Sequence, residues 1–448
     1  MNIQEAAAAL RARKISSVEM VEESLKRTAR DRLNAFITVT AEAARAEAKE
    51  RDAELARGVD RGPLHGIPIA HKDLIQTRGV RTTAGSKILA DFIPDEDAVV
   101  AARLREAGAI SIGKTGLHEL AYGITSTNPH FGAVRNPWDP ERIPGGSSGG
   151  SGAAVAADLV FMATGTDTGG SIRIPSSFCG TVGLKPTYER VSRRGVIPLS
   201  MTMDHIGPMT RTVRDTAICF QAMAENASGY VPAGQAELGG LRIGVPRNFY
   251  FDSLDAEVAA AVRGAIQTAA AIGGRVVEVT VPDINAINAA GRVLLLVEAA
   301  ANWRPHLNRR GDFGADVLAL LDQGRLILGI DYADALRLRR IYAREFSRVW
   351  SKADCLIVPA TPAAAPKIGE MTVDIAGKRD DVRMISTRLM RAVNMLGVPS
   401  LAMPCGFTRS RLPIGMQILG PARSEDTLLR IGAAIEDALG LAESLKLS

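Results

Sequence analysis

Two glycine-rich stretches hold the serines of this sequence that could act as nucleophiles. Residues 145–152 read GGSSGGSG, and residues 165–173 read GTDTGGSIR. Two glycines precede Ser171, which lets backbone N–H groups converge beside its hydroxyl, as an oxyanion-binding site requires. A flexible turn would have a similar composition, but active sites of α/β proteins gather in loops between strands and helices. These stretches therefore predict a site for attack on a carbonyl carbon.

Lys72 is the residue best suited to serve these serines as a base. It lies in the apolar segment 67–75, where burial would bring its pKa far below the usual value of about 10.4. A lysine at a strand end could instead extend to solvent. Its neighbour His71 would point to the opposite side of an alternating strand.

Two other motifs suggest different chemistry, but their contexts argue against it. Residues 146–150 fit GxSxG, which would make Ser148 the nucleophile of an α/β-hydrolase. Pro140 and Pro144 occupy the place of the strand that must precede such a nucleophile. Residues 108–115 fit the P-loop pattern, but the four inner residues read as a strand and not as a phosphate-binding loop.

The histidines and cysteines predict neither a metal site nor a cofactor. The six histidines lack HxxxH and HxH spacing, and the separations of the four cysteines match no zinc motif. Each cysteine has apolar or small neighbours in the sequence, which favours a buried free thiol. Free thiols are typical of proteins in the reducing cytoplasm. We expect no metal and no cofactor.

Strand and helix patterns alternate around these residues. Strands are expected at 67–71, 109–112, 241–245, 275–281, 355–358 and 400–403, and helices at 1–57, 98–107, 153–157, 255–271 and through most of 284–350. This alternation predicts an α/β fold with a mostly parallel sheet. Residues 226–240 read as a surface connection, but later strands are expected to rejoin the same sheet, which favours one large domain.

Composition narrows the class of protein. The chain has 448 residues, 46% of them hydrophobic and 23% charged, as in soluble globular proteins. The net charge is +5 without a run of five like charges, so we expect no nucleic-acid partner. The N-terminus lacks the apolar core of a signal peptide, and no 18 uncharged apolar residues follow one another. We therefore expect a cytoplasmic protein that does not span a membrane.

The quoted stretches together resemble the amidase signature family. The resemblance is strong over 64–212, through PLHGIPIAHKDLI, IPGGSSGGSG, ATGTDTGGSIRIPSSFCGTVGLKPT and DHIGPMTRTVRD, and GVPSLAMPCG and LPIGMQILGP extend it weakly toward the C-terminus. It implies a single large α/β/α domain around a mixed, mostly parallel, twisted sheet of about ten strands. Residues 1–62 are expected to form a helical segment packed on this domain, which spans 63–448.

The resemblance also implies catalytic roles. The family's catalytic lysine falls on Lys72, its bridging serine, held by a cis peptide bond, on Ser147, and its nucleophile on Ser171. Ser147 would pass a proton from the nucleophile to the lysine and later donate one to the leaving nitrogen. The backbone N–H groups expected to bind the oxyanion belong to Thr168, Gly169, Gly170 and Ser171.

Further residues are expected to support this site. Ser148, Asp167 and Arg173 would hold the reacting groups in place, with a surface salt bridge as the alternative for the last two. The residues expected to line the acyl side of the substrate pocket are Ala121, Tyr122, Gly123 and Ile124.

The expected reaction is hydrolysis of non-peptide C–N bonds in a small amide. Aryl amides and carbamates (urethanes) share the required carbonyl geometry, and esters should also react. The alternative within the family is the glutamine-hydrolysing component of a tRNA-dependent amidotransferase, which would need partner chains. The modest charge favours an independent hydrolase, acting as a monomer or homodimer.

Overall fold

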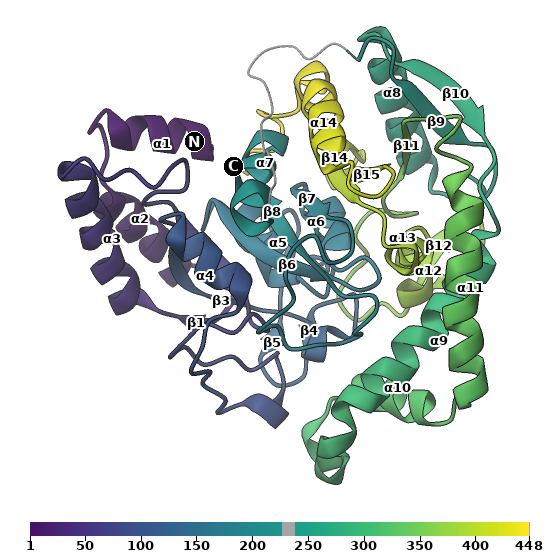
Figure 1. The fold of residues 1–448 in the computed structure, drawn as a ribbon, viewed down its shortest axis with the longest axis horizontal. Coiled ribbons are helices and arrows are strands. Elements are labelled where there is room, and N and C mark those ends of the chain that lie inside the picture. The colour runs from purple at the N-terminus through teal and green to yellow at the C-terminus, as the bar shows by residue number, and fades with distance from the viewer. Residues whose placement is uncertain (226–237, 448) are drawn as a thin grey trace.

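A large mixed sheet runs through the centre of the computed structural model (Figure 1). Its strands are β1 (Phe36–Val39), β2 (Pro68–Lys72), β3 (Ile110–Thr115), β6 (Met162–Asp167), β7 (Val182–Lys185), β8 (His205–Thr210), β9 (Arg242–Pro246), β10 (Arg275–Val279), β11 (Cys355–Pro359), β14 (Ser400–Phe407) and β15 (Pro413–Leu419). These 11 strands lie in the order β1-β3-β2-β6-β8-β7-β14-β15-β11-β9-β10. Two small hairpins, β4 (Thr127–Asn128) with β5 (Gly132–Ala133) and β12 (Thr372–Ile375) with β13 (Lys378–Asp381), lie outside this sheet.

The helices pack on both faces and at the two ends of the sheet. They are α1 (Ile3–Arg11), α2 (Ser17–Ala29), α3 (Ala41–Ala56), α4 (Val99–Glu106), α5 (Gly149–Ala156), α6 (Arg173–Cys179), α7 (Val213–Met223), α8 (Ala256–Ala271), α9 (Ile284–Trp303), α10 (Ala315–Arg325), α11 (Gly329–Ser347), α12 (Val382–Arg388), α13 (Arg391–Leu396) and α14 (Glu425–Leu439), with the 3-10 helices η1 (Lys87–Leu89), η2 (Glu119–Ala121) and η3 (Arg304–Asp312). In Figure 1, α1 to α3 lie at one end of the molecule and α9 to α11 at the other. The structure describes residues 1–225 and 238–447, so most of the expected connection at 226–240 lies outside the described residues.

The expectation of an α/β fold around one large mixed sheet is confirmed. Parallel pairing holds in two blocks, β3-β2-β6 and β11-β9-β10, and the strands between them pair antiparallel. Both blocks contain strands expected from the alternating pattern. The helical stretch expected at 284–350 is present as α9, α10 and α11.

The expectation that residues 1–57 are entirely helical is wrong at β1. Phe36 pairs with Thr115, and Val39 with Gly113, which makes β1 an antiparallel edge strand beside β3. Aromatic and β-branched residues such as those of FITV favour strands, and the pairing satisfies backbone groups that β3 would otherwise leave open. The N-terminal segment thus contributes a strand to the main sheet.

The parallel strands β2 and β6 position the candidate site. They pair directly through Ile69 with Met162 and Ala70 with Ala163. Parallel neighbours end at the same edge of a sheet, so the loops that follow both strands meet there.

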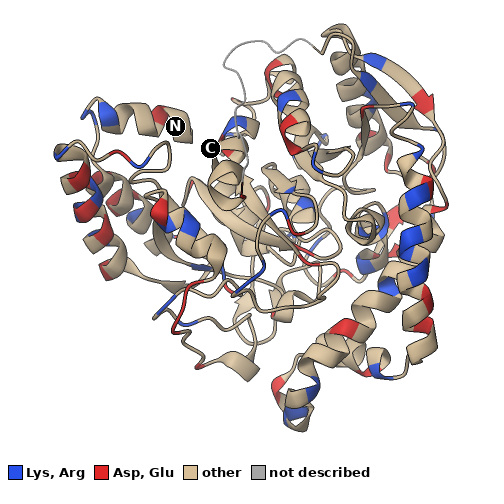
Figure 2. Ribbon diagram, in the orientation of Figure 1, with Lys and Arg blue, Asp and Glu red and all other residues tan. Residues whose placement is uncertain are grey.

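The most apolar long helix is α9 with its continuation to Asp312. By length and composition this segment, Ile284–Asp312, could cross a membrane, and 56% of its most apolar window is buried inside the protein. It packs against α10, α11 and α13, so its apolar residues have protein neighbours. The basic residues of the outer helix α11 are all arginines, at positions 337, 339, 340 and 344 (Figure 2).

Candidate active site

Lys72, the last residue of β2, is fully buried against three hydroxyl groups. Its Nζ donates hydrogen bonds to Ser147 Oγ (2.7 Å), Ser148 Oγ (2.9 Å) and Thr166 Oγ1 (2.8 Å). In the described part of the chain, no carboxylate lies within ion-pair distance of this amine. Burial lowers the pKa of Lys72 to about 7, against the more distant attraction of carboxylates. A lysine with this pKa is partly neutral at physiological pH and can accept a proton.

The serine loop approaches Lys72 directly before α5. The peptide bond between Gly146 and Ser147 is cis, as the family resemblance implied. Gly145 has φ +83°, and a side-chain carbon there would lie 2.8 Å from the backbone of Pro175, so only glycine fits. The helix begins at Gly149, earlier than the 153–157 segment expected from sequence.

Ser171 lies in the loop that follows β6 and is 6% exposed. The backbone N–H of Ser148 donates to the carbonyl oxygen of Ser171 at 3.2 Å, which joins the two serine loops. No hydrogen bond links the Ser147 and Ser171 hydroxyls in the described residues. The structure therefore brings Lys72, Ser147 and Ser148 into direct contact and holds Ser171 beside them through the backbone.

Residues 168–171, the loop expected to bind the oxyanion, are called the oxyanion loop below. One of its four expected N–H donors is already engaged in a hydrogen bond within the protein. The Gly170 N–H already donates to Asp167 Oδ1 at 2.8 Å, because the carboxylate turns back into its own loop. Within the described residues, the N–H groups of Gly169 and Ser171 have no hydrogen-bond acceptor. Gly170 has φ +123°, and a side-chain carbon there would lie 2.8 Å from Ile174, so its conformation requires glycine. Its role is thus to shape the loop.

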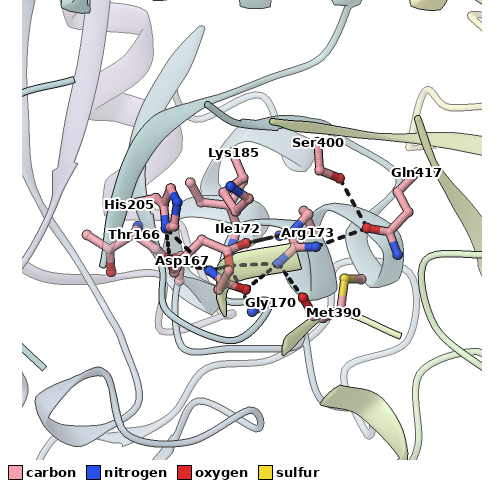
Figure 3. Close-up of polar contacts among 12 residues, drawn as sticks. Thr166, Asp167, Gly170, Ile172, Arg173, Lys185, His205, Met390, Ser400 and Gln417 are labelled. Carbon is pink, nitrogen blue, oxygen red and sulfur yellow. Dashed lines mark hydrogen bonds and ion pairs between the residues drawn. The ribbon is translucent and has the colours of Figure 1, made fainter. Parts of the chain in front are cut away.

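Asp167 and Arg173 form a fully buried ion pair behind the oxyanion loop (Figure 3). Arg173 Nε and Nη2 bind the two carboxylate oxygens at 3.0 Å each, the fork geometry typical of strong arginine–carboxylate pairs. Burial opposes ionisation of Asp167, but the Arg173 guanidinium holds the pKa of this carboxyl well below its usual range. The alternative of a surface salt bridge is excluded.

Residues far away in sequence complete this buried network. Asn394 donates to the carbonyl and Oδ1 of Asp167 at 2.8 Å each, and Gln417 Oε1 accepts from Arg173 Nη1 at 3.0 Å. His205 Nδ1 lies 3.2 Å from the Asp167 carbonyl oxygen. Sequence reasoning missed all three partners, although Gln417 lies in the quoted segment LPIGMQILGP.

Thr166 and Asp204 were also missed. Thr166 contacts Lys72 as described above and lies within the quoted stretch ATGTDTGGS, which was its only signal. Asp204 Oδ1 accepts from Thr168 Oγ1 at 2.6 Å, and burial raises the pKa of this carboxyl to about 6. Thr166, Thr168 and Asp204 line a cavity of about 310 Å³ beside the oxyanion loop.

The four residues expected to line the substrate pocket have different environments. Ala121 lines the 310 Å³ cavity. Tyr122 is 3% exposed, and its ring lies 5.6 Å from the guanidinium carbon of Arg383. Gly123 lies against the ring of His118. Ile124 is buried in a separate apolar cluster, where it packs as a core residue.

The GxSxG alternative finds no support in the contacts of Ser148. Its Oγ accepts from the Thr166 N–H and donates to the Thr166 carbonyl, both at 3.2 Å, in addition to its bond with Lys72. These contacts suit a serine that holds Lys72 and the Thr166 backbone in place, and not a nucleophile. Residues 1–225 and 238–447 contain no group of three His, Cys, Asp or Glu side chains that could hold a metal, and the four cysteines are buried and free.

The fold and the comparisons with known proteins define a hydrolase that acts on C–N bonds. The family model named Amidase matches residues 19–429, and the chain belongs to this family.

Relatives match over nearly the whole chain. A glutamyl-tRNA(Gln) amidotransferase subunit from Azoarcus sp. (strain BH72) is 41% identical over 96% of this chain and 96% of the relative. A solved structure from "an unexpected vestigial protein complex" that "reveals the evolutionary origins of an s-triazine catabolic enzyme" has 36% identity, a TM-score of 0.91 and 98% coverage of both chains. The native peptide amidase from Stenotrophomonas maltophilia has 32% identity and a TM-score of 0.84, covering 98% of this chain and 97% of that one.

Proposed function

We propose that this chain hydrolyses the C–N bond of a small amide through an acyl-enzyme on Ser171. The observation that carries the proposal is the contact between the buried Lys72 amine and Ser147 Oγ at 2.7 Å, with the pKa of the lysine near 7. In this mechanism neutral Lys72 accepts a proton from Ser147 as Ser147 takes one from Ser171. The Ser171 oxygen then attacks the carbonyl carbon.

The oxyanion that forms would be bound by the loop before the nucleophile. The N–H groups of Thr168, Gly169 and Ser171 are the proposed donors, since the Gly170 N–H is bound to Asp167. The buried Asp167–Arg173 pair would keep the loop in position. Ser147 would then donate its proton to the leaving nitrogen, and water would release the acyl group by the reverse path. The missing hydrogen bond between the two serine hydroxyls would form when substrate is bound.

For the substrate, the comparisons favour glutamine hydrolysis within an amidotransferase complex over the independent hydrolase that sequence analysis preferred. The amidotransferase subunit from Azoarcus matches 96% of the chain, and this match includes the C-terminal half. In that role the chain would release ammonia from glutamine and act together with partner chains. The modest net charge then reflects that another chain of the complex would contact the tRNA.

An independent amide hydrolase is the second candidate, and the likeness to a peptide amidase supports it. Cleavage of carbamates and esters is proposed for the independent hydrolase only, because these reactions would not require a partner chain. Both candidates are proposed to act in the cytoplasm, where the four free cysteines would stay reduced.

The test is to purify the tagged chain from its source organism and from a heterologous host. Ammonia release from glutamine is measured alone and with any co-purifying chains, beside anilides, short amides and aryl carbamates. Partner-dependent glutaminase activity supports the amidotransferase role. Rapid anilide or carbamate cleavage by the lone chain, without glutaminase activity, supports the independent hydrolase. Neither activity, together with no fluorophosphonate labelling of Ser171, rejects the proposal.

A further inference from the structure

Three arginines from three helices converge beside the oxyanion loop. Arg292 lies on α9, Arg383 lies on α12, and Arg391 begins α13. A side-chain carbon placed on Gly169 would lie 3.8 Å from Arg391 Nε. The Arg391 guanidinium therefore borders the loop that leads to Ser171.

These arginines have neutral partners only. Arg391 Nη2 donates to Thr387 Oγ1 at 3.0 Å, and Arg383 Nη2 donates to the carbonyl oxygen of Tyr122 at 2.9 Å. Within the described part of the chain, none of the three is within ion-pair distance of a carboxylate. Arg173 differs from these arginines: it also lies beside the oxyanion loop, but its charge is balanced by Asp167.

Carboxylates do border the cluster, but each is held by another group. The pairs are His118 with Asp316 (2.9 Å), the Met384 N–H with Asp381 (2.9 Å), and Lys378 with Asp380 (3.5 Å). Asp316 and Asp381 still attract Arg383 through space, but the charged groups that act on Arg391 are Arg292 and Arg383, which carry the same sign.

Two buried donors in this cluster also lack acceptors. Arg391 is 8% exposed and its Nε has no hydrogen-bond partner, and Tyr122 is 3% exposed and its hydroxyl has none, among the residues that the structure describes. Burial, together with repulsion from Arg292 and Arg383, lowers the pKa of Arg391 to about 10. A buried charge and unpaired donors are costly unless an anion compensates them.

A cavity of about 430 Å³ opens next to these donors. The charged residues that line it are Arg292, Arg388, Arg391 and the ion pair of Lys378 with Asp380. Its buried Asn288 Oδ1 and Arg388 Nη1 also have no partner in the described residues. This volume is that of a small-molecule site. A polynucleotide backbone could not reach a guanidinium as buried as that of Arg391.

We infer that Arg391, with Arg292, Arg383 and the Tyr122 hydroxyl, forms a subsite that binds a carboxylate of the substrate. The amide cleaved at Ser171 would then be an amide acid. Guanidinium groups bind carboxylates through paired, charge-assisted hydrogen bonds, which would satisfy the open donors. This inference rests on the proposed amide hydrolysis and adds the residues that would bind a carboxylate of the substrate, a group that glutamine also carries.

The test compares amide acids with neutral amides of the same shape. Succinamate, glutaramate and adipamate are each paired with the amide in which methyl replaces the carboxylate: butanamide, pentanamide and hexanamide. For the best pair, kcat/KM should favour the amide acid by at least about 100-fold, because a site built for a charged group rejects analogues that lack it. Arg391→Met should reduce this ratio to below about 5-fold through a higher KM, and Arg391→Lys should restore part of it.

A second measurement does not require turnover. Glutarate should slow fluorophosphonate labelling of Ser171 in the wild type but not in Arg391→Met. Arg263→Met is the matched control, since this exposed arginine on α8 lies over Phe251 and touches neither loop. It should keep both the preference and the protection.

The outcomes separate the inference from the proposed function. If Ser171 is labelled and the neutral amides are cleaved as well as the amide acids, the inference is overturned and the hydrolase proposal stands. Protection by RNA and not by any dicarboxylate would also overturn it. If Ser171 is not labelled and no amide is cleaved, either by the chain alone or together with its co-purifying chains, the proposed function itself fails.

Discussion

Lys72 Nζ lies 2.7 Å from Ser147 Oγ, and both side chains are fully buried. The other acceptors of this amine, on Ser148 and Thr166, are also hydroxyls, which solvate an ammonium less well than water or a carboxylate would. The amine can therefore lose its proton near neutral pH. A base of this kind would allow the proposed serine chemistry to proceed without histidine.

Ser171→Ala should abolish turnover while leaving the fold intact. The variant removes the proposed nucleophile, and no hydrogen bond in the described residues involves this hydroxyl, so stability should not change. We expect kcat to fall by at least about 10⁴-fold. Amide hydrolysis and the thermal unfolding midpoint check both parts. Retained nitroanilide cleavage would falsify the nucleophile assignment.

The pH profile of kcat/KM should report the pKa of the lysine–serine unit. Below about pH 7 the lysine is an ammonium and cannot accept a proton, and above it the neutral amine can, so activity should rise as pH increases through about 7. Lys72→Ala should remove this rise and lower the rate by about 10³-fold or more. Lys87→Ala, at an exposed position, is the control. An unchanged profile in Lys72→Ala would exclude this lysine as the base.

Ser147→Ala should slow amides more than activated esters. A nitrogen leaving group needs a relayed proton, whereas nitrophenolate leaves without one. We expect the amide-to-ester ratio of kcat/KM to fall by at least about 10-fold. Ser148→Ala is the matched comparison, because this neighbour also contacts Lys72, and its ratio should stay near that of the wild type. Equal losses on both substrates in Ser147→Ala would contradict the relay.

Arg173→Met should destabilise the protein by about 3–5 kcal/mol, because Asp167 would remain buried without its counter-charge. Urea unfolding at pH 7 measures the change, with Arg263→Met as a surface control. The sign of the pH dependence follows from the lowered pKa of Asp167. Its stabilising contribution is present above the pKa of an unfolded aspartate, about 3.9, and is lost as pH falls toward the lower folded value. A small change in Arg173→Met would mean that the pair contributes little.

EDTA should leave amide hydrolysis unchanged, because the described residues offer no ligand cluster for a metal. The measurement is activity before and after dialysis against the chelator. Loss of activity that zinc restores would require a different mechanism.

The local sequence was sufficient to predict the elements and residues whose patterns are short. The strand around Lys72 and the two serine-bearing loops follow from apolar runs and clustered glycines. The family resemblance then supplied the large sheet and the cis peptide before Ser147. The strand β1 was not predicted, because its four residues between two helices are too few to show a clear alternation of apolar and polar side chains.

The amino-acid sequence was enough to place a lysine and three serines in segments suited to the proposed acyl transfer, since glycine content and apolar character are local properties. The contacts of these groups became known from the tertiary structure. It showed that Asp167 binds Arg173 inside the protein and occupies the Gly170 amide. It also placed Arg391 beside Gly169, although Gly169 lies 222 positions earlier in the chain. Such contacts depend on how distant segments pack, and no short sequence pattern encodes that packing.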